Sequence, residues 1–383
     1  MKRDTIISIA KGIAIILMVV AHAEAPGWLC EFIFEFHMPL FFITAGYFFS
    51  TKYLTDEATF VKKRIKGLYW PFVKWSVFFL ILHNWMFDIG ILNEVYGNEQ
   101  GGVLHPWSAH QIQQNLWTIV TAMSGYDAFL CGAFWFFRGL FVASILYLIL
   151  YKLTDKCLSR LPGLSRFTPY AVCIVMLLLC GWKTWEGLKV VNLVQGGYRD
   201  MMGCFFFGVG FIFRQYTEGY RHFIRSHRLT AICLTVAFCA IVYLFSEYLT
   251  ANMNWRSTFK QFLSLPVPAI LGFLMTYHLS MWIDSKEGKL RDFLIYVGDR
   301  TLNIFIFHII SYKVVSLIKI WYYGLDIRQI GCHMVIHDYS QQDCFWILYT
   351  IAGVGIPLAG TWLSEKVKAR FKAGRASSAS PVQ

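Results

Sequence analysis

The strongest constraint on this sequence is a series of long apolar runs separated by short polar segments. A helix needs about 20 mostly apolar residues to cross the hydrocarbon core of a bilayer. The low charge content agrees, since 15% of the 383 residues are charged and soluble domains have about 25%. The sequence therefore predicts an all-α polytopic integral membrane protein. Ten candidate spans are expected, at residues 6–24, 32–50, 68–90, 134–151, 169–183, 200–214, 229–248, 262–282, 295–318 and 344–364.

The distribution of lysine and arginine supports ten spans with both termini in the cytoplasm. Cytoplasmic loops are enriched in these residues. With the N-terminus inside, the internal segments carry 23 lysines and arginines and the external segments carry 6. The net charge of +12 is therefore interpreted as a topology signal, and no nucleic-acid partner is expected. The external segment 91–133 carries no lysine or arginine, and its amphipathic part predicts a short surface helix near residues 110–123.

A single transmembrane domain is expected over residues 1–370, followed by a disordered cytoplasmic tail at 371–383 that is small and polar. The first apolar run lacks a small-residue cleavage site, so we expect it to remain as the first span. Most of the ten cysteines lie in apolar runs without a CxxC pair, so no metal site is predicted. Three cysteines fall in external segments, where a disulfide between two of them stays open: Cys30, Cys131 and Cys332.

The first span contains two polar residues, Lys11 and His22. At 100° per residue, their separation is close to three full turns, so they share one helix face about 16 Å apart along the axis. Ser8, Ile15 and Met18 complete this stripe. Ionisable groups inside a membrane are costly, at about 2.5–3.5 kcal/mol on insertion scales, and usually serve function. The alternative is that Lys11 extends to the inner interface and His22 only marks the outer end of the span.

The hairpin between the first and second spans places more polar residues at a depth in the membrane similar to that of His22. Glu24 lies in the short loop, and Glu35 and His37 lie near the start of the second span. A histidine with a carboxylate partner is a natural general base near neutral pH. We therefore expect His22 to act with Glu35 and His37 at the outer mouth of the first hairpin. The alternative for His37 is a structural hydrogen bond that orders the hairpin.

Two segments together resemble the membrane acyltransferase family three, typified by bacterial polysaccharide O-acetyltransferases. They are "AKGIAIILMVVAH", where Lys11, ten further residues and His22 match the family's first-helix signature, and "FHMPLFFITAGYFF". "KKRIKGLYWPF" at 62–72, "FWFFRGLF" at 134–141 and "VGDRTLNIFIFHI" at 297–309 also resemble family segments. The resemblance covers nearly the whole chain. Many members carry aspartate at the position of Ser8 and arginine at that of Lys11.

The resemblance implies transfer of an acyl group, by analogy acetyl, from cytoplasmic acyl-CoA to a hydroxyl of an extracytoplasmic glycan or glycolipid. Acyl-CoA would be a co-substrate, and no permanently bound cofactor is expected. The location implied is the bacterial cytoplasmic membrane. His22 would act as general base on the acceptor, with an acyl-histidine intermediate as the alternative. The acceptor and the oligomeric state are not predicted.

The same resemblance suggests two groups of binding residues. Lysine and arginine bind phosphates well, so a basic cluster ahead of the third span is expected to hold acyl-CoA, unless it only follows the positive-inside rule and contacts anionic lipid. Its members are Lys62, Lys63, Arg64 and Lys66. Trp135, Arg138 and His308 are candidate acceptor contacts, although Arg138 equally suits an interfacial anchor. A glycolipid transporter or flippase is the alternative function, and a catalytically silent scaffold is the third.

Overall fold

The computed structural model describes residues 4–97, 104–188, 197–251, 253, 258–259, 264–336 and 343–378, with side chains as far as residue 370. Within these residues every regular element is helical, as predicted. The α-helices are α1 (Thr5–His22), α2 (Gly27–Phe34), α3 (His37–Tyr47), α4 (Glu57–Arg64), α5 (Trp70–Asp88), α6 (Ala109–Ala122), α7 (Trp135–Leu158), α8 (Thr168–Trp185), α9 (Tyr198–Ser226), α10 (Arg228–Tyr248), α12 (Pro266–Asp284), α13 (Lys289–Asp299), α14 (Thr301–Tyr323) and α15 (Phe345–Ser378).

Nine helical segments of the described chain are long and apolar enough to cross a membrane. They correspond to nine of the ten predicted runs. The remaining run, 200–214, lies inside α9, which is helical but falls outside this group because polar residues flank its apolar middle. The predicted run 295–318 is divided, since the backbone leaves the helical conformation at Arg300 and α14 begins after it. Helix α15 extends to Ser378, into the predicted tail, and residues 379–383 lie outside the described residues.

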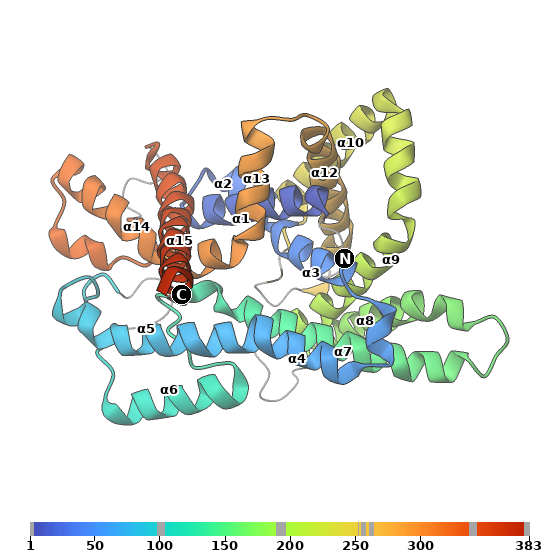
Figure 1. The fold of residues 1–383 in the computed structure, drawn as a ribbon, viewed down its shortest axis with the longest axis horizontal. Coiled ribbons are helices and arrows are strands. Elements are labelled where there is room, and N and C mark those ends of the chain that lie inside the picture. Colours follow the sequence, from blue (N-terminus) through green and yellow to red (C-terminus); the bar gives the residue numbers. More distant parts are fainter. Residues whose placement is uncertain are drawn as a thin grey trace, which may run out of the picture.

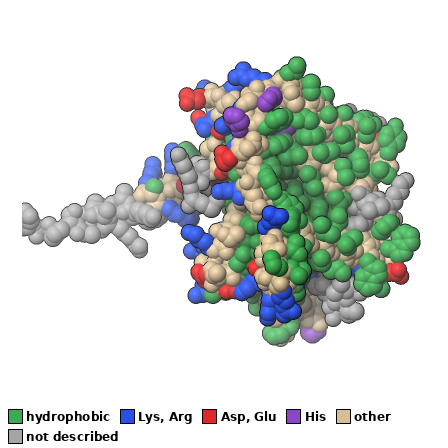
Figure 2. All heavy atoms as spheres, turned by 90° about the vertical axis from the view of Figure 1, so that its right-hand side faces the viewer, with side chains coloured by type: hydrophobic (Ala, Val, Ile, Leu, Met, Phe, Trp, Pro, Cys, Tyr) green, Lys and Arg blue, Asp and Glu red, His purple; other side chains and the backbone are tan. Residues whose placement is uncertain are grey.

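Helix α1 lies at the centre of the bundle, in contact with α2, α3, α12, α13, α14 and α15 (Figure 1). Because other helices surround α1, most of its apolar residues are buried within the protein and do not face lipid. Peripheral helices instead expose apolar side chains, such as Leu178 of α8 and Val236 of α10. Figure 2 shows one such face, mostly hydrophobic, with lysine and arginine gathered toward its edges. Contact of such a surface with lipid is favourable, whereas its exposure to water would be unfavourable.

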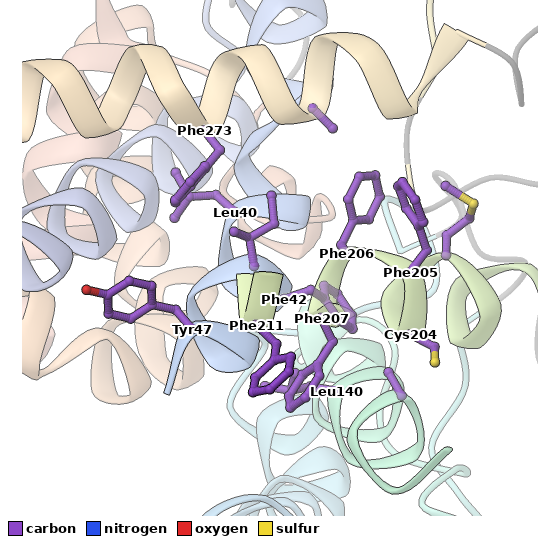
Figure 3. Packing of buried hydrophobic residues seen from close by; sticks show 14 of the residues in the cluster. Leu40, Phe42, Tyr47, Leu140, Cys204, Phe205, Phe206, Phe207, Phe211 and Phe273 are labelled. Atoms are coloured by element: carbon purple, nitrogen blue, oxygen red, sulfur yellow. The ribbon is translucent and has the colours of Figure 1, made fainter. Parts of the chain in front are cut away.

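Glycines allow α3 and α9 to approach closely. A Cβ atom on Gly210 would come within 1.8 Å of the carbonyl oxygen of Ile43, and one on Gly46 within 1.8 Å of that of Phe207. Aromatic side chains fill the space around this contact (Figure 3). Phe42 from α3 and Phe211 from α9 belong to this cluster, which joins α3, α7, α9 and α12 into one packing unit.

A second close contact joins α1 to α13. A Cβ atom on Gly298 would lie 1.7 Å from the carbonyl oxygen of Ser8, and one on Gly12 would lie 2.4 Å from that of Leu294. Any larger side chain at these two glycines would therefore push the helices apart. This contact fixes the height of α13 beside the turn of α1 that carries Lys11.

Polar contacts between distant segments agree with the predicted alternation of sides. Asp4 bonds to Arg221, with 2.7 Å between Oδ2 and Nη2, and both residues belong to segments assigned to the cytoplasm. Glu35 accepts a 2.9 Å hydrogen bond from the backbone N–H of Ala251, and both were assigned to the outer side. If the number of spans between the two partners were wrong by one, the sequence would have placed them on opposite sides of the membrane.

The predicted surface helix is present as α6, which lies alongside α5 at the edge of the molecule (Figure 1). A capping box begins it: the Ser108 hydroxyl accepts from the N–H of Gln111, whose side chain accepts from the N–H of Ser108. Leu116, Trp117 and Val120 are exposed on one of its faces. An amphipathic helix with an exposed apolar face suits the boundary between lipid and water.

All ten cysteines are free, so the disulfide left open above is not formed in this structure. Cys157 and Cys344 are exposed and lie on opposite predicted sides, whereas Cys131 is 1% exposed. We expect a membrane-impermeant maleimide added to intact cells to label Cys344 and to label Cys157 only after permeabilisation. Mass spectrometry of the labelled peptides checks this, with Cys344→Ser and Cys157→Ser as controls. Labelling of Cys157 alone in intact cells would show that the true topology is the inverse of the predicted one.

Candidate active site

The predicted stripe of α1 faces a cavity of about 270 Å³. Lys11, Ile15 and Met18 line it, together with residues from α3, α7 and α14 and the Gly67–Leu68 segment. We call this space the inner cavity. Lys11 is the one ionisable side chain among its lining residues, which are otherwise mostly apolar. The helical spacing predicted from the sequence therefore places one cation in an apolar cavity that reaches Met18, a single helical turn before His22.

His22 is paired with His308 of α14. His22 Nδ1 lies 3.0 Å from His308 Nε2, and the two rings stack with their centroids 5.2 Å apart and an angle of 17° between them. His22, the last residue of α1, is partly exposed, whereas His308 is fully buried. His308 was predicted as an acceptor contact, and the structure places it in contact with His22.

The hydrogen bonds of this pair fix its protonation. His308 Nδ1 lies 2.9 Å from the carbonyl oxygen of Phe305 and 3.2 Å from that of Ile304. Carbonyl oxygens only accept, so Nδ1 of His308 bears the proton and Nε2 of the neutral ring has a lone pair. His22 Nδ1–H must then donate to His308, and Nε2 of His22 keeps a lone pair of its own. Such a nitrogen can accept a proton from a substrate hydroxyl.

The carboxylate partner expected for His22 is not found among its contacts in the described chain. Glu35 is buried but turns toward Ala251, so His308 orients His22 instead. His37 donates from Nδ1 to the carbonyl oxygen of Ile33 at 2.8 Å, the structural bond considered above. His37 interacts electrostatically with His22, as does His333 from an outer segment. Among the described residues, no group of histidines, cysteines and carboxylates is arranged to hold a metal ion.

A carboxylate lies beside the turn of Lys11, although it comes from another helix. Ser8, three residues before Lys11, donates its hydroxyl to Asp299 Oδ1 at 2.9 Å. Asp299 is the last residue of α13 and is held there by the Gly12–Gly298 contact. Sequence reasoning did not select Asp299, because nothing in its local pattern indicates contact with a residue 291 positions away.

The predicted basic cluster borders the cytoplasmic side of the inner cavity. Lys62, Lys63 and Lys66 are exposed, and Lys63 Nζ donates to the Tyr53 hydroxyl at 2.9 Å. A π-helix at Ile65–Tyr69 follows, and its Gly67 and Leu68 line the cavity. Such irregular turns are frequent at functional sites.

Arg64 differs from its lysine neighbours. Its guanidinium packs over the ring of Phe60, 4.8 Å from the centroid, and over that of Phe207 at 5.5 Å. The exposed lysines are therefore better arranged than Arg64 to meet an anion from the cytoplasm.

A second hollow of about 230 Å³, the outer pocket, is lined by Tyr126, Trp135, Arg138, Arg199 and Asp200 among others. Trp135 and Arg138 were predicted acceptor contacts, and the structure brings them together here. The guanidinium of Arg199 lies over the Trp135 ring, 4.5 Å from its centroid. Sequence reasoning missed Tyr126, Arg199 and Asp200, since each looked like an ordinary residue at the end of a loop or span.

The first turns of α7 separate the two spaces. Phe136, Phe137 and Leu140 line the inner cavity, whereas Trp135 and Arg138 line the outer pocket. At 100° per residue these two sets lie on opposite faces of the helix. A wall one helix thick therefore divides the apolar cavity from the charged pocket.

The comparisons with known proteins give one match. The model of acyltransferase family 3, described as an acyltransferase domain, matches residues 4–365. This range contains both cavities and the histidine pair. No curated protein and no solved structure gives a significant match.

Proposed function

The chain belongs to acyltransferase family 3, and we propose that it transfers an acetyl group from cytoplasmic acetyl-CoA to a hydroxyl of an extracytoplasmic glycan or glycolipid. The main support is the row of Lys11, Ile15 and Met18 along a cavity that ends one turn before a histidine with a free Nε2. We propose the bacterial cytoplasmic membrane as its location, because the acyl donor is made in the cytoplasm and the acceptor lies outside.

The donor would enter from the cytoplasm. The phosphates of CoA carry negative charge, which the exposed Lys62, Lys63 and Lys66 can neutralise. The pantetheine arm is narrow, with methylene and methyl groups between its two amides, and the inner cavity offers an apolar lining to its hydrocarbon parts. The Lys11 ammonium, the one charged donor among the lining residues, can donate hydrogen bonds to the amide or thioester oxygens of this arm.

His22 would then act as general base. As the acceptor oxygen attacks the thioester carbonyl carbon, its proton moves to His22 Nε2. The C–S bond breaks when the tetrahedral intermediate collapses, and the imidazolium returns the proton to the thiolate sulfur. CoA leaves as the thiol, the ester is formed, and His22 is neutral again. His308 accepts a hydrogen bond from Nδ1 throughout, which holds the ring in one tautomer and stabilises its cationic form.

Comparison of surface glycans from cells with and without the protein tests this function. We expect acetyl-sized mass differences on glycans that disappear in the deletion strain and return with the wild-type protein, as read by mass spectrometry. Purified protein in lipid vesicles should also convert labelled acetyl-CoA to free CoA only when an acceptor glycan is present. Identical glycans in both strains would contradict acyl transfer. Lipid-linked precursor that accumulates inside the deletion strain would instead indicate a transporter.

A further inference from the structure

We propose that the outer pocket recognises an oxyanion on the acceptor, so that the substrate is a sugar bearing a carboxylate or a phosphate. This inference rests on the proposed function in one respect only, namely that the ligand of the pocket is the acyl acceptor. Four features support it: the charges of the pocket, the unused hydrogen-bonding capacity of Asp200 and Arg138, the size of the pocket and its contacts toward the histidines.

The pocket contains more positive than negative charge. Arg138 and Arg199 are electrostatic neighbours of each other and of Asp200. Burial raises the pKa of Tyr126 to about 12, so its phenol stays neutral and adds no charge. Two guanidinium groups against one carboxylate leave a net positive site, and two like charges in a partly buried site disfavour each other. A bound oxyanion would relieve this repulsion and could take paired hydrogen bonds from a guanidinium.

Two of the charged groups, Asp200 and Arg138, keep hydrogen-bonding capacity that the described chain does not use. Asp200 is 4% exposed and its Oδ2 has no hydrogen-bond partner in the described chain. Arg138 forms no hydrogen bond or salt bridge with the described residues. By contrast, Arg300 at the other side of the molecule makes three hydrogen bonds to Glu365. A buried carboxylate oxygen without a partner is costly, and hydroxyl groups of a sugar are suitable donors for it.

The dimensions suit one sugar residue. The volume of about 230 Å³ lies below the 300–1,000 Å³ range that is common for pockets of larger ligands. Trp135 supplies an aromatic wall, while Arg199 stacked on it fixes the orientation of that guanidinium. An entire lipid carrier or a polysaccharide segment would have to extend beyond the pocket, with one charged residue held inside.

The segment after α6 brings lining residues of the pocket close to the histidines through a short series of side-chain neighbours. This segment includes Tyr126 and Ala128, and the next residue, Phe129, contacts His333 with the ring centroids 4.8 Å apart. His333 is in turn an electrostatic neighbour of His22. Burial, aided by Lys313, lowers the pKa of His333 to about 4, so it adds no charge at neutral pH. These contacts place the pocket on the same outer side as His22, so an acceptor that extends beyond the pocket would bring a hydroxyl of a neighbouring sugar to His22.

The inference is tested by calorimetry on the full-length protein in lipid nanodiscs. The probes are methyl glucuronide, glucose 1-phosphate and the neutral methyl glucoside. We expect at least one charged sugar to bind at least ten-fold more tightly than the neutral one. Arg138→Gln should abolish this preference, and Arg138→Lys should retain part of it. Arg160→Gln, an exposed arginine just beyond the other end of α7, should leave the preference unchanged.

Equal affinity for charged and neutral sugars would overturn the inference, as would a preference that survives Arg138→Gln. The ratio between the two charged probes identifies a carboxylate or a phosphate as the preferred group. Because binding requires no chemistry, His22→Ala protein should show the same preference. A wild-type protein that shows this preference but acetylates no glycan would reject the proposed function alone, whereas acetylation by a wild-type protein without any charge preference would reject the present inference alone.

Discussion

Replacement of His22 by alanine is expected to lower the turnover of acetyl transfer by about 10²–10⁴-fold, the usual contribution of a positioned general base. The expectation follows from the hydrogen bonds of His308, which leave Nε2 of His22 as the basic atom of the pair. The substitution removes that atom, so the acceptor hydroxyl must lose its proton to water. The measurement is the rate of acetyl transfer by purified protein at saturating acetyl-CoA.

Variants of His308 test whether this residue orients His22. In His308→Gln, the glutamine amide oxygen can still accept from His22 Nδ1, whereas His308→Ala leaves that donor without its partner. We therefore expect His308→Gln to retain more activity than His308→Ala, and both to retain more than His22→Ala. Because a cationic His22 is no longer stabilised as well, its neutral, basic form persists to lower pH, and the His308 variants should shift the pH profile of turnover to lower pH. A His22→Ala protein that inserts normally and transfers acetyl groups at the wild-type rate would exclude His22 as the base.

Replacement of Lys11 by alanine is expected to lower kcat/KM for acetyl-CoA by about 10- to 100-fold, as for the loss of one hydrogen bond to a charged group. Lys11 is the one ionisable residue that lines the inner cavity, so no neighbouring lining residue can replace its charge. Lys11→Arg keeps the cation and several donors, and it should be tolerated. Steady-state kinetics with acetyl-CoA as the varied substrate provide the measurement.

Lys11→Met is a useful control, since it keeps an unbranched apolar side chain of similar length without the charge. If Lys11 acts by its charge, the methionine and alanine variants should have the same defect. Wild-type kinetics in both variants would show that Lys11 only extends to the membrane interface. A defect in the alanine variant alone would indicate packing in place of charge.

Periodicity and charge distribution were enough to predict the membrane fold. The three-turn spacing of Lys11 and His22 predicted a shared face, and Lys11 does line a cavity with the stripe residues Ile15 and Met18. The lysine and arginine pattern predicted the alternation of sides that the contact of Asp4 with Arg221 supports. These features are local or cumulative along the chain, so they can be read from one sequence.

The partners within the site could not be predicted in the same way. His22 meets His308 across 286 residues, and Ser8 meets Asp299 across 291. Such contacts depend on how the helices pack, which glycines such as Gly12 and Gly298 decide. The carboxylate expected for His22 was chosen by proximity in sequence. In the folded chain, Glu35 turns toward Ala251 instead.

The wall formed by the first turns of α7 has a consequence for the membrane itself. An enzyme that transfers a group between two aqueous compartments must not let ions leak across the bilayer, because a leak would dissipate the ion gradients. Phe137 of this wall packs against Phe305 of α14, with the ring centroids 5.3 Å apart, and both line the inner cavity. Rings without polar atoms give a hydrated ion or a chain of waters nothing to bond to. We therefore expect this apolar wall to hinder the passage of ions and protons while the proposed acyl transfer takes place.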